Sequence, residues 1–193
     1  MNIERLPIRH GHFLLESGLH SDVWIDLDAW FVDLQKIEPD IAALAELIQQ
    51  HDVTAICGPL LGGAFVAQAL ASRLGLHFYC TESFRPSDGN GLYQAVYRLP
   101  KGQRKQAAGE RVAVVDDVIS AGSSVRATVA ELEEAGASVQ VVGALLLLGN
   151  KATEHFSKHR IPVVAPAMRA FEMWEPNSCP LCKAGKPLQN PYD

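Results

Sequence analysis

Residues 112–124 constrain the fold of this chain more than any other segment. Four apolar residues, Val112 to Val115, are followed by two adjacent aspartates, a loop of small residues and the start of a helical pattern. An apolar run without alternation is typical of a strand that is buried on both faces of a parallel sheet. The segment therefore predicts a strand, a short loop and a helix, which is the repeating unit of parallel α/β folds.

The same alternation of strand and helix patterns continues along the chain. Expected strands lie at residues 24–27, 54–57, 77–80, 92–97, 111–115, 139–148 and 162–165, and expected helices at residues 39–50, 64–74, 124–135 and 151–159. Right-handed crossovers join parallel strands of this kind. We predict an α/β fold with a mainly parallel twisted sheet flanked by helices, in a single domain that spans residues 1–193.

Composition and charge exclude several classes of protein. The net charge is −5 and no long basic run is present, whereas nonspecific nucleic-acid binding needs a basic surface. The longest aliphatic tract, residues 144–148, is too short to span a membrane, and residues 1–5 lack the apolar core of a secretion signal. Four cysteines in a chain of this length do not suggest a disulfide scaffold. We expect a cytoplasmic protein that binds neither nucleic acid nor a membrane.

Chemically active residues follow the strand expected at 111–115. Asp116 and Asp117 come directly after it, at the edge where open α/β sheets bind their ligands. The next loop has little bulk, so its N–H groups and the dipole of the following helix can surround an anion. Its residues are Ser120, Ala121, Gly122, Ser123 and Ser124. The alternative is a plain turn with N-cap serines and solvent-facing acids. Because adjacent carboxylates repel each other, we favour a binding site.

This order of apolar run, paired acids, two aliphatic residues and Ser-Ala-Gly-Ser loop resembles a known motif. Type I phosphoribosyltransferases use it to bind 5-phosphoribosyl-1-pyrophosphate (PRPP). The resemblance implies the type I phosphoribosyltransferase fold and transfer of phosphoribosyl from PRPP to a nitrogenous base, with release of pyrophosphate. Asp116 and Asp117 would then bind the ribose hydroxyls, with one of them a candidate proton acceptor, and residues 120–124 would bind the 5-phosphate. Mg²⁺ would neutralise the pyrophosphate, largely through substrate oxygens and water.

A second glycine-rich loop follows the strand expected at 54–57. It contains Gly58, Pro59, Leu60, Leu61, Gly62 and Gly63, and a helical pattern begins directly after it. In type I phosphoribosyltransferases the equivalent loop binds pyrophosphate, and the resemblance implies the same role here. The alternative is a plain strand-to-helix turn.

The amino-terminal segment resembles the start of orotate phosphoribosyltransferases. In that family a Phe-x-Leu-x-Ser-Gly-x-x-Ser pattern helps to build a hood over the base, and the residues that fit it are Phe13, Leu15, Ser17, Gly18 and Ser21. The resemblance extends, with gaps, to about Leu148. We expect residues 1–35 to form a hood and residues 170–193 to form a C-terminal tail. An arm that merely packs is the alternative.

Several cations of the orotate family are missing from this chain. Glu16 stands where the family has a lysine before the Ser-Gly pair, and Leu61 and Gly62 stand in the region of a loop lysine. Residues 149–151 replace an arginine that meets the orotate carboxylate. Orotate and PRPP are both anions. The resemblance therefore supports phosphoribosyl transfer more strongly than it supports orotate as the acceptor.

The mobile-loop string Arg-Lys-x-x-Lys-x-His-Gly of the orotate family is also absent. The nearest basic residues are Arg85, Arg98, Lys101, Arg104 and Lys105. We assign Arg98 and Lys101 to substrate binding, in a polar segment at 98–109 that closes over the site and excludes water. An ordinary exposed connector is the alternative.

Cys179 and Cys182 have the spacing of half a zinc site. His155 and His159 lie four residues apart on an expected helix and would supply the other two ligands. We favour the alternative of a free cysteine pair in a tail turn, with surface histidines.

Three functions remain open. The first is an enzyme, a pentosyltransferase that acts on orotate or a related base. The second is a noncatalytic PRPP-binding regulatory protein, because this fold also serves in regulators. The third is an interaction protein whose cysteine pair binds a partner. The resemblance further implies a homodimer.

Overall fold

The computed structural model of the chain describes residues 8–15, 18–25, 28–84 and 96–190. The strands are β1 (Ile8–Leu14), β2 (His20–Ile25), β3 (Ala55–Pro59), β4 (His77–Phe84), β5 (Val96–Arg98), β6 (Arg111–Ile119), β7 (Ser138–Leu148), β8 (Val163–Val164) and β9 (Met168–Arg169). The helices are α1 (Asp28–Phe31), α2 (Leu34–Ile48), α3 (Gly62–Leu74), α4 (Lys101–Arg104), α5 (Ser123–Glu134), α6 (Lys151–Lys158) and α7 (Pro180–Lys183).

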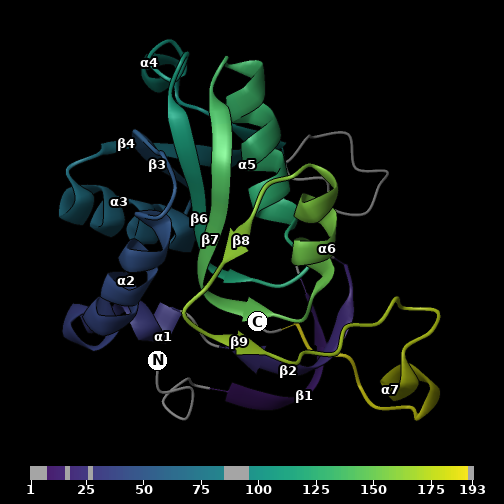
Figure 1. Cartoon of the computed structure of the whole chain (residues 1–193). Helices are drawn as coiled ribbons and strands as arrows, with labels where there is room; N and C mark the ends of the chain where they lie inside the picture. The colour runs from purple at the N-terminus through teal and green to yellow at the C-terminus, as the bar shows by residue number, and fades with distance from the viewer. Residues whose placement is uncertain (1–7, 16–17, 26–27, 85–95, 191–193) are drawn as a thin grey trace.

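A seven-stranded sheet forms the centre of the molecule (Figure 1). Its strands follow the order β5-β4-β3-β6-β7-β8, and β9 also pairs with β7. All of these pairs are parallel except β4–β5, which is antiparallel. Helices cover both faces of the sheet, as parallel strands joined by helical crossovers require. The predicted fold, a mainly parallel sheet flanked by helices, is confirmed.

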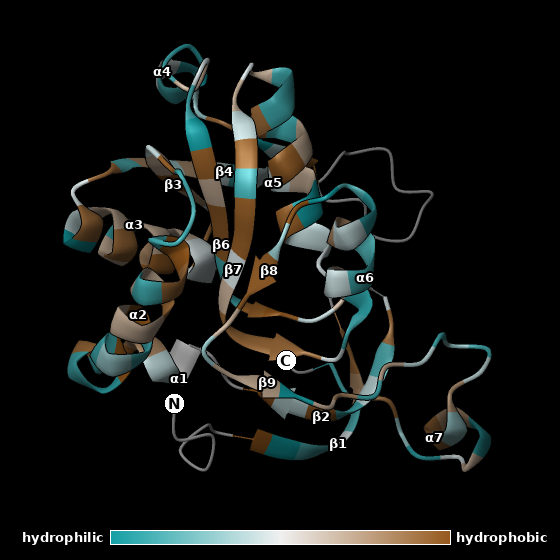
Figure 2. Cartoon of the chain, viewed as in Figure 1, coloured by the Kyte–Doolittle hydropathy of each residue, from teal (hydrophilic) through white to brown (hydrophobic). Residues whose placement is uncertain are grey.

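Strand β6 shows why the apolar run has no alternation. Val112 and Val114 pack in the cluster that contains α5 and α6, whereas Ala113 and Val115 pack in the cluster that contains α2 and α3. All four side chains are fully buried, and burial of one valine stabilises the fold by roughly 1.5–3 kcal/mol. Figure 2 shows a mostly hydrophobic central sheet, flanked by helices in which hydrophobic and hydrophilic residues are mixed.

Helix boundaries were predicted with mixed success. Helix α2 begins at Leu34 rather than at Pro39, because the carboxylate of Asp33 caps it by accepting a hydrogen bond from the N–H of Gln35 at 3.2 Å. Pro39 therefore lies inside the helix, and its prediction as a first residue was wrong. At the end of α3, Gly75 adopts φ +67°, the left-handed conformation expected of a glycine that terminates a helix.

An antiparallel hairpin, β1–β2, lies across the carboxyl end of the sheet (Figure 1). Its Ile25 packs in one cluster with Leu146 and Leu148 of β7. The C-terminal segment then adds two backbone bridges to the hairpin, between His20 and Trp174 and between Phe13 and Gln189. Strand β1 was not predicted, and the strand expected at 24–27 forms earlier, as β2.

Strand β6 is longer than its apolar run. It continues through the two aspartates to Ile119 and pairs with β7 along this length. The acids were expected after the strand, and they lie within its carboxyl half instead. Among the described residues, the helices are all too short or too polar to cross a membrane.

Candidate active site

A cavity of about 650 Å³ opens beside the carboxyl half of β6. The pairing of β3 with β6 ends at Cys57 and Val114, whereas the pairing of β6 with β7 continues to Ile119 and Leu147. The two central strands therefore separate on one side, and the loops that follow them surround the gap. This is the place where open parallel sheets bind ligands, and the volume suits a small molecule.

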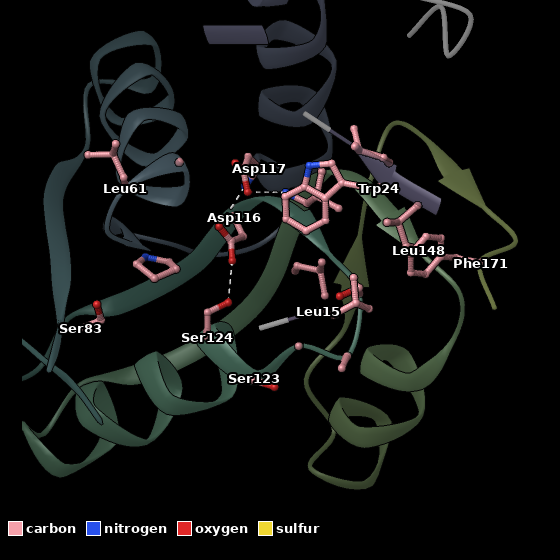
Figure 3. Close-up of a pocket in the computed structure, with 18 of the residues that line it drawn as sticks. Leu15, Trp24, Leu61, Ser83, Asp116, Asp117, Ser123, Ser124, Leu148 and Phe171 are labelled. Carbon is pink, nitrogen blue, oxygen red and sulfur yellow. Dashed lines mark hydrogen bonds between the residues drawn. The ribbon is translucent and has the colours of Figure 1, made fainter. Parts of the chain in front are cut away.

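Asp116 and Asp117 lie at the centre of this cavity (Figure 3). The hydroxyl of Ser124 donates a hydrogen bond to Oδ2 of Asp116 at 2.8 Å, and the N–H of Asp117 donates one to Oδ1 of Asp116 at 3.1 Å. Burial, reinforced by the adjacent carboxylate of Asp117, raises the pKa of Asp116 well above its usual range, although the Ser124 hydroxyl opposes this shift. Asp116 is thus a buried carboxyl suited to holding a proton or, when ionised, to accepting a hydrogen bond from a ligand hydroxyl.

The small-residue loop forms the adjoining wall of the cavity. All five of its residues line the wall, namely Ser120, Ala121, Gly122, Ser123 and Ser124. Gly122 directly precedes the first turn of α5 and has φ +76°, a left-handed backbone conformation that would be strained in a residue with a side chain. The Arg126 guanidinium donates to the Ala121 carbonyl at 3.0 Å and holds the loop to the helix. The loop amides and the helix dipole can therefore act on one anion.

The second glycine loop faces the acids from β3. Residues 59–62 line the cavity, and the N–H of Leu60 donates to the carbonyl of Thr81 at 2.8 Å. A Cβ atom at Gly62 would overlap the carboxylate of Asp117, and one at Gly63 would lie 2.6 Å from Oδ1 of Asp116. The peptide bond between Leu60 and Leu61 is cis. The two predicted loops thus meet at the same pair of acids, as the sequence interpretation requires.

An apolar wall closes the other side of the cavity. Trp24 and Leu15 come from the hairpin segment, and Leu148 and Phe171 come from the end of β7 and the C-terminal segment. In Figure 3, Trp24, Leu148 and Phe171 lie on one side of the two acids, with Leu61 and Ser83 on the opposite side. Phe171 was not predicted, because the sequence around it contains no motif. Only the tertiary fold brings it here.

The cations are arranged differently from the prediction. Among the described lining residues Arg9 is the one with a cationic side chain, and its guanidinium carbon lies 5.7 Å from the centroid of the Phe13 ring. Arg98 instead pairs with Glu131 at 2.8 Å, and Lys101 is exposed at the start of α4. Neither of these two residues lines the cavity. Arg9 was missed because it belongs to β1, which the sequence did not predict.

The polar segment 98–109 is held away from the cavity. The hydroxyl of Tyr79 donates to the Gln106 carbonyl at 3.0 Å, and the side chain of Gln103 accepts from the N–H of Cys80 at 2.9 Å. The N–H of Leu99 donates to Glu131 at 3.1 Å. These contacts fit the alternative of an ordinary connector. Arg85 and Glu16, which also entered the sequence interpretation, lie outside the described residues.

The Cys-x-x-Cys pair meets different histidines from those predicted. Cys179 and Cys182 lie with His12 and His20 of the hairpin segment, in a group whose ligand atoms are all within 4.8 Å of one another. His155 on α6 and His159 at its C-cap have ring centroids 5.1 Å apart with the rings tilted at 40°, and they do not join that group. Their assignment as ligands is corrected, because the C-terminal segment runs along the hairpin rather than along α6.

Comparison with known proteins agrees with this geometry. Residues 31–172 match the model of the phosphoribosyl transferase domain family. The chain is similar to the orotate phosphoribosyltransferase of Wolinella succinogenes, with 30% identity over 98% of this chain and 96% of the relative. It is also similar to that of Thermotoga maritima, with 29% identity over 95% of this chain and 91% of the relative.

Solved structures show the same architecture. The orotate phosphoribosyltransferase from Aeropyrum pernix superimposes with a TM-score of 0.67 and 25% identity, over 83% of this chain and 87% of that one. An adenine phosphoribosyltransferase from Thermoanaerobacter pseudethanolicus shares the fold, with a TM-score of 0.61 and 20% identity over 76% and 88% of the two chains.

A mainly parallel sheet covered on both faces, with paired acids and two loops of small residues around one cavity at its edge, is the architecture of a phosphoribosyl-binding α/β protein. The chain belongs to the phosphoribosyltransferase family, and within it resembles the orotate phosphoribosyltransferases. Its reaction class is the transfer of phosphoribosyl from PRPP to a nitrogenous base, with release of pyrophosphate.

Proposed function

We propose that the acceptor is orotate or a closely related pyrimidine base, and that Mg²⁺ accompanies PRPP in the cavity. The relatives named orotate phosphoribosyltransferase support this acceptor, because they match nearly the whole chain. The observation that carries the proposal is the meeting of two loops at one pair of carboxylates, inside a cavity large enough for a sugar phosphate and a base.

The phosphoribosyl group occupies the polar half of the cavity in this proposal. The amides of residues 120–124 bind the 5-phosphate, and Asp116 and Asp117 accept hydrogen bonds from the ribose hydroxyls. The transition state of such a transfer has oxocarbenium character, so the carboxylates also stabilise developing positive charge. The raised pKa of Asp116, caused by its burial, suits it to take up the proton that the attacking base releases.

The pyrophosphate lies toward residues 58–63, where backbone amides replace the lysine of the orotate family. The oxygen donors present, the carboxylates of Asp116 and Asp117, fit the preference of Mg²⁺ for hard ligands. When bound, the ion neutralises the leaving pyrophosphate. Close packing of Gly62 and Gly63 against the two acids keeps side chains out of this region.

The base lies against the apolar wall. Trp24 and Phe171 offer aromatic surfaces to a planar ring, and Leu15 and Leu148 exclude water. Arg9 supplies the positive charge that an anionic acceptor such as orotate needs. We expect Arg9→Gln to raise the KM for orotate about tenfold while leaving the affinity for PRPP within about twofold, since a charge-assisted hydrogen bond contributes roughly 1.5–3 kcal/mol.

A pyrophosphate-release assay with PRPP, Mg²⁺ and a panel of bases tests the proposal. We expect turnover with orotate that exceeds turnover with adenine, and loss of turnover in the double variant Asp116→Asn/Asp117→Asn. Turnover with adenine but not with orotate would assign a different acceptor. Retained PRPP affinity in the double variant would show that the ribose lies elsewhere.

The second candidate is a noncatalytic PRPP-binding protein. One observation favours it: Arg9 is the one cationic side chain among the described lining residues, although PRPP is strongly anionic. Calorimetric binding of PRPP without pyrophosphate release, for every base in the panel, would support this function over the enzyme.

We also propose a homodimer in the cytoplasm. Val32, Leu34, Leu61 and Phe65 expose 84%, 67%, 60% and 48% of their surface, and the Phe65 ring lies 5.7 Å from that of Phe31. Apolar exposure on this scale is typical of a protein interface. Light scattering should give twice the chain mass, and Phe65→Glu should reduce it. None of the four cysteines forms a disulfide, which fits a reducing compartment.

A further inference from the structure

Two cysteines and two histidines from opposite ends of the chain converge beside the hairpin, away from the residues that line the cavity. His12 lies on β1 and His20 begins β2, while Cys179 is the N-cap of α7 and Cys182 lies within that helix. We infer that these four side chains bind a structural Zn²⁺ ion that fastens the C-terminal segment to the hairpin.

The distances between the ligand atoms match a tetrahedral zinc site. Nε2 of His12 lies 3.0 Å from Nδ1 of His20, 3.5 Å from Sγ of Cys179 and 3.8 Å from Sγ of Cys182, and the last sulfur lies 3.3 Å from Nδ1 of His20. Ligands at the usual Zn–N and Zn–S distances occupy the corners of a tetrahedron with edges of roughly 3.3–3.8 Å. These four distances differ from such edges by only a few tenths of an ångström, and the two remaining pairs, both from Sγ of Cys179, lie within 4.8 Å, so a modest closing of the group would let all four atoms coordinate one ion.

The surrounding hydrogen bonds orient the ligands for this role. The other ring nitrogen of His12, Nδ1, lies 2.9 Å from the carbonyl of Lys186 and donates to it, which directs the lone pair of Nε2 toward the cysteines. Metal-bound histidines usually make such a bond through the nitrogen that does not bind the ion. Three of the four ligands are buried, since His12 is 2% exposed, His20 5% and Cys179 0%.

The donor set selects the ion. Two thiolates and two imidazoles suit tetrahedral Zn²⁺, whereas Mg²⁺ and Ca²⁺ prefer oxygen ligands. The cysteines are separated by two residues, the spacing that structural zinc sites use. With four protein ligands the coordination sphere is closed, so the ion acts in structure and does not contact substrate.

The four ligands would hold the C-terminal segment against the β1–β2 hairpin. Near it, the C-terminal segment is held to the hairpin by backbone bonds at His20 and Trp174, of 2.8 and 2.9 Å, and by a bond of 2.8 Å from the N–H of Gln189 to the carbonyl of His12. The hairpin supplies Trp24 and Arg9 to the cavity, and the segment leading to the cysteines supplies Phe171. Zinc therefore fixes both parts of the apolar wall in one position.

Elemental analysis of the full-length protein, purified without chelators and with reductant present, tests the inference directly. We expect one equivalent of zinc per chain. Cys179→Ser and Cys182→Ser should each reduce the zinc content at least about tenfold. The matched controls are the double variant His155→Gln/His159→Gln, which changes the other histidine pair, and Cys80→Ser, which changes a cysteine elsewhere. Both controls should keep the full equivalent.

A second measurement covers the case in which the cysteine variants do not fold. Exchange of the wild-type ion for Co²⁺ should give the visible absorption of a tetrahedral cobalt site, together with thiolate-to-metal charge-transfer bands. Removal of the ion with a chelator should lower the melting temperature and change the fluorescence of the tryptophans, one of which, Trp174, pairs with His20.

Three outcomes would overturn the inference. One is wild-type protein with less than about a tenth of an equivalent of zinc that takes up none when zinc is added under reducing conditions. Another is a Cys179–Cys182 disulfide that persists in reductant. The last is loss of zinc from the His155→Gln/His159→Gln control with retention in Cys179→Ser. None of these readouts depends on phosphoribosyl transfer, so they are independent of the proposed function.

Discussion

The close packing of Gly63 against Asp116 allows a quantitative test of the active site. A Cβ at this position would lie 2.6 Å from Oδ1 of Asp116 and 2.7 Å from Cδ of Pro59, whereas ordinary van der Waals contact begins at 3.4 Å. In Gly63→Ala both contacts must therefore lengthen, by about 0.8 Å to the carboxylate and about 0.7 Å to the proline. Because the new methyl group is placed between them, neither group can move without changing the distance between the loop and the acid.

A displacement of this size should act mainly on catalysis. Misplacement of a positioning group by about 1 Å can reduce a rate about 100-fold, which corresponds to roughly 2.7 kcal/mol. We expect kcat/KM of Gly63→Ala to fall about 10- to 100-fold and the affinity for PRPP to fall with it. The effect runs against helix propensity, since replacing glycine with alanine inside a helix normally stabilises it by up to about 1 kcal/mol.

The assay is pyrophosphate release over a range of PRPP concentrations, with thermal melting to establish that the variant is folded. Gly102→Ala is the matched control, because Gly102 also lies in a helix and a Cβ there would meet nothing within 4 Å. That control should keep wild-type activity. If Gly63→Ala keeps kcat/KM within about twofold of wild type, the loop and the acid do not act together and the assignment is refuted. In a double-mutant cycle of unfolding free energies, Gly63→Ala and Asp116→Ala should be coupled by about 0.5–3 kcal/mol.

Other predictions concern titration and reactivity. Burial and the charge of Asp117 raise the pKa of Asp116, so the folded chain holds a proton that the unfolded chain releases. The free energy of unfolding should therefore fall as pH rises from about 4 toward the raised pKa. In urea titrations at a series of pH values, Asp116→Asn should remove this fall, and the same variant should abolish turnover. For Glu131, burial alone would raise the pKa, but hydrogen bonds from Arg104 and Arg98 outweigh it and lower the pKa. Its contribution is therefore present above the ordinary glutamate pKa and is lost as pH falls through the folded value. Glu131→Gln should lower the free energy of unfolding at neutral pH by about 1–3 kcal/mol, and an unchanged urea midpoint would contradict this. Burial, with Cys80 nearby, raises the pKa of the Cys57 thiol, so iodoacetamide should label Cys57 only after unfolding, as mass spectrometry can establish.

Local sequence was enough to predict the polar half of the site. Asp116, Asp117 and the loop at 120–124 are contiguous, and their strand–loop–helix context is itself encoded by apolar runs and glycines. The geometry of such a unit depends on neighbours within about a dozen residues. The structure places these residues together in one cavity, as their contiguity in the sequence requires, and their role in binding an anion stays a prediction that rests on backbone amides and a helix terminus.

The apolar half and the metal ligands could not be predicted in the same way. Trp24 and Phe171 lie close together in the fold although most of the chain separates them in the sequence, and the same is true of His12 and Cys179. No helix or strand periodicity in the sequence indicates that such distant residues are neighbours. The cysteine spacing did indicate half a metal site. The histidines were then chosen from α6 because four-residue spacing on a helix is visible in a sequence, whereas His12 and His20 become neighbours only when the hairpin forms.

Helix α2 was misplaced at its start for a related reason. Pro39 matched the statistics of a first helical residue, but the carboxylate of Asp33 provides a cap earlier in the chain. The tertiary contacts of the buried face, from Ile37 to Ile48, then keep the proline inside the helix.

The bridges that join Phe13 to Gln189 and His20 to Trp174 have a consequence for biosynthesis. On the ribosome the hairpin is made first, yet its backbone partners emerge more than 150 residues later, after the central sheet can already have formed. The nascent chain can therefore form the edge of the sheet that carries Asp116 and Asp117 well before the apolar wall of the cavity is complete. A polypeptide whose synthesis stops before residue 174 would retain the acids and both glycine loops but leave the hairpin without its partner segment, so its outer strand would be open to pairing with other chains.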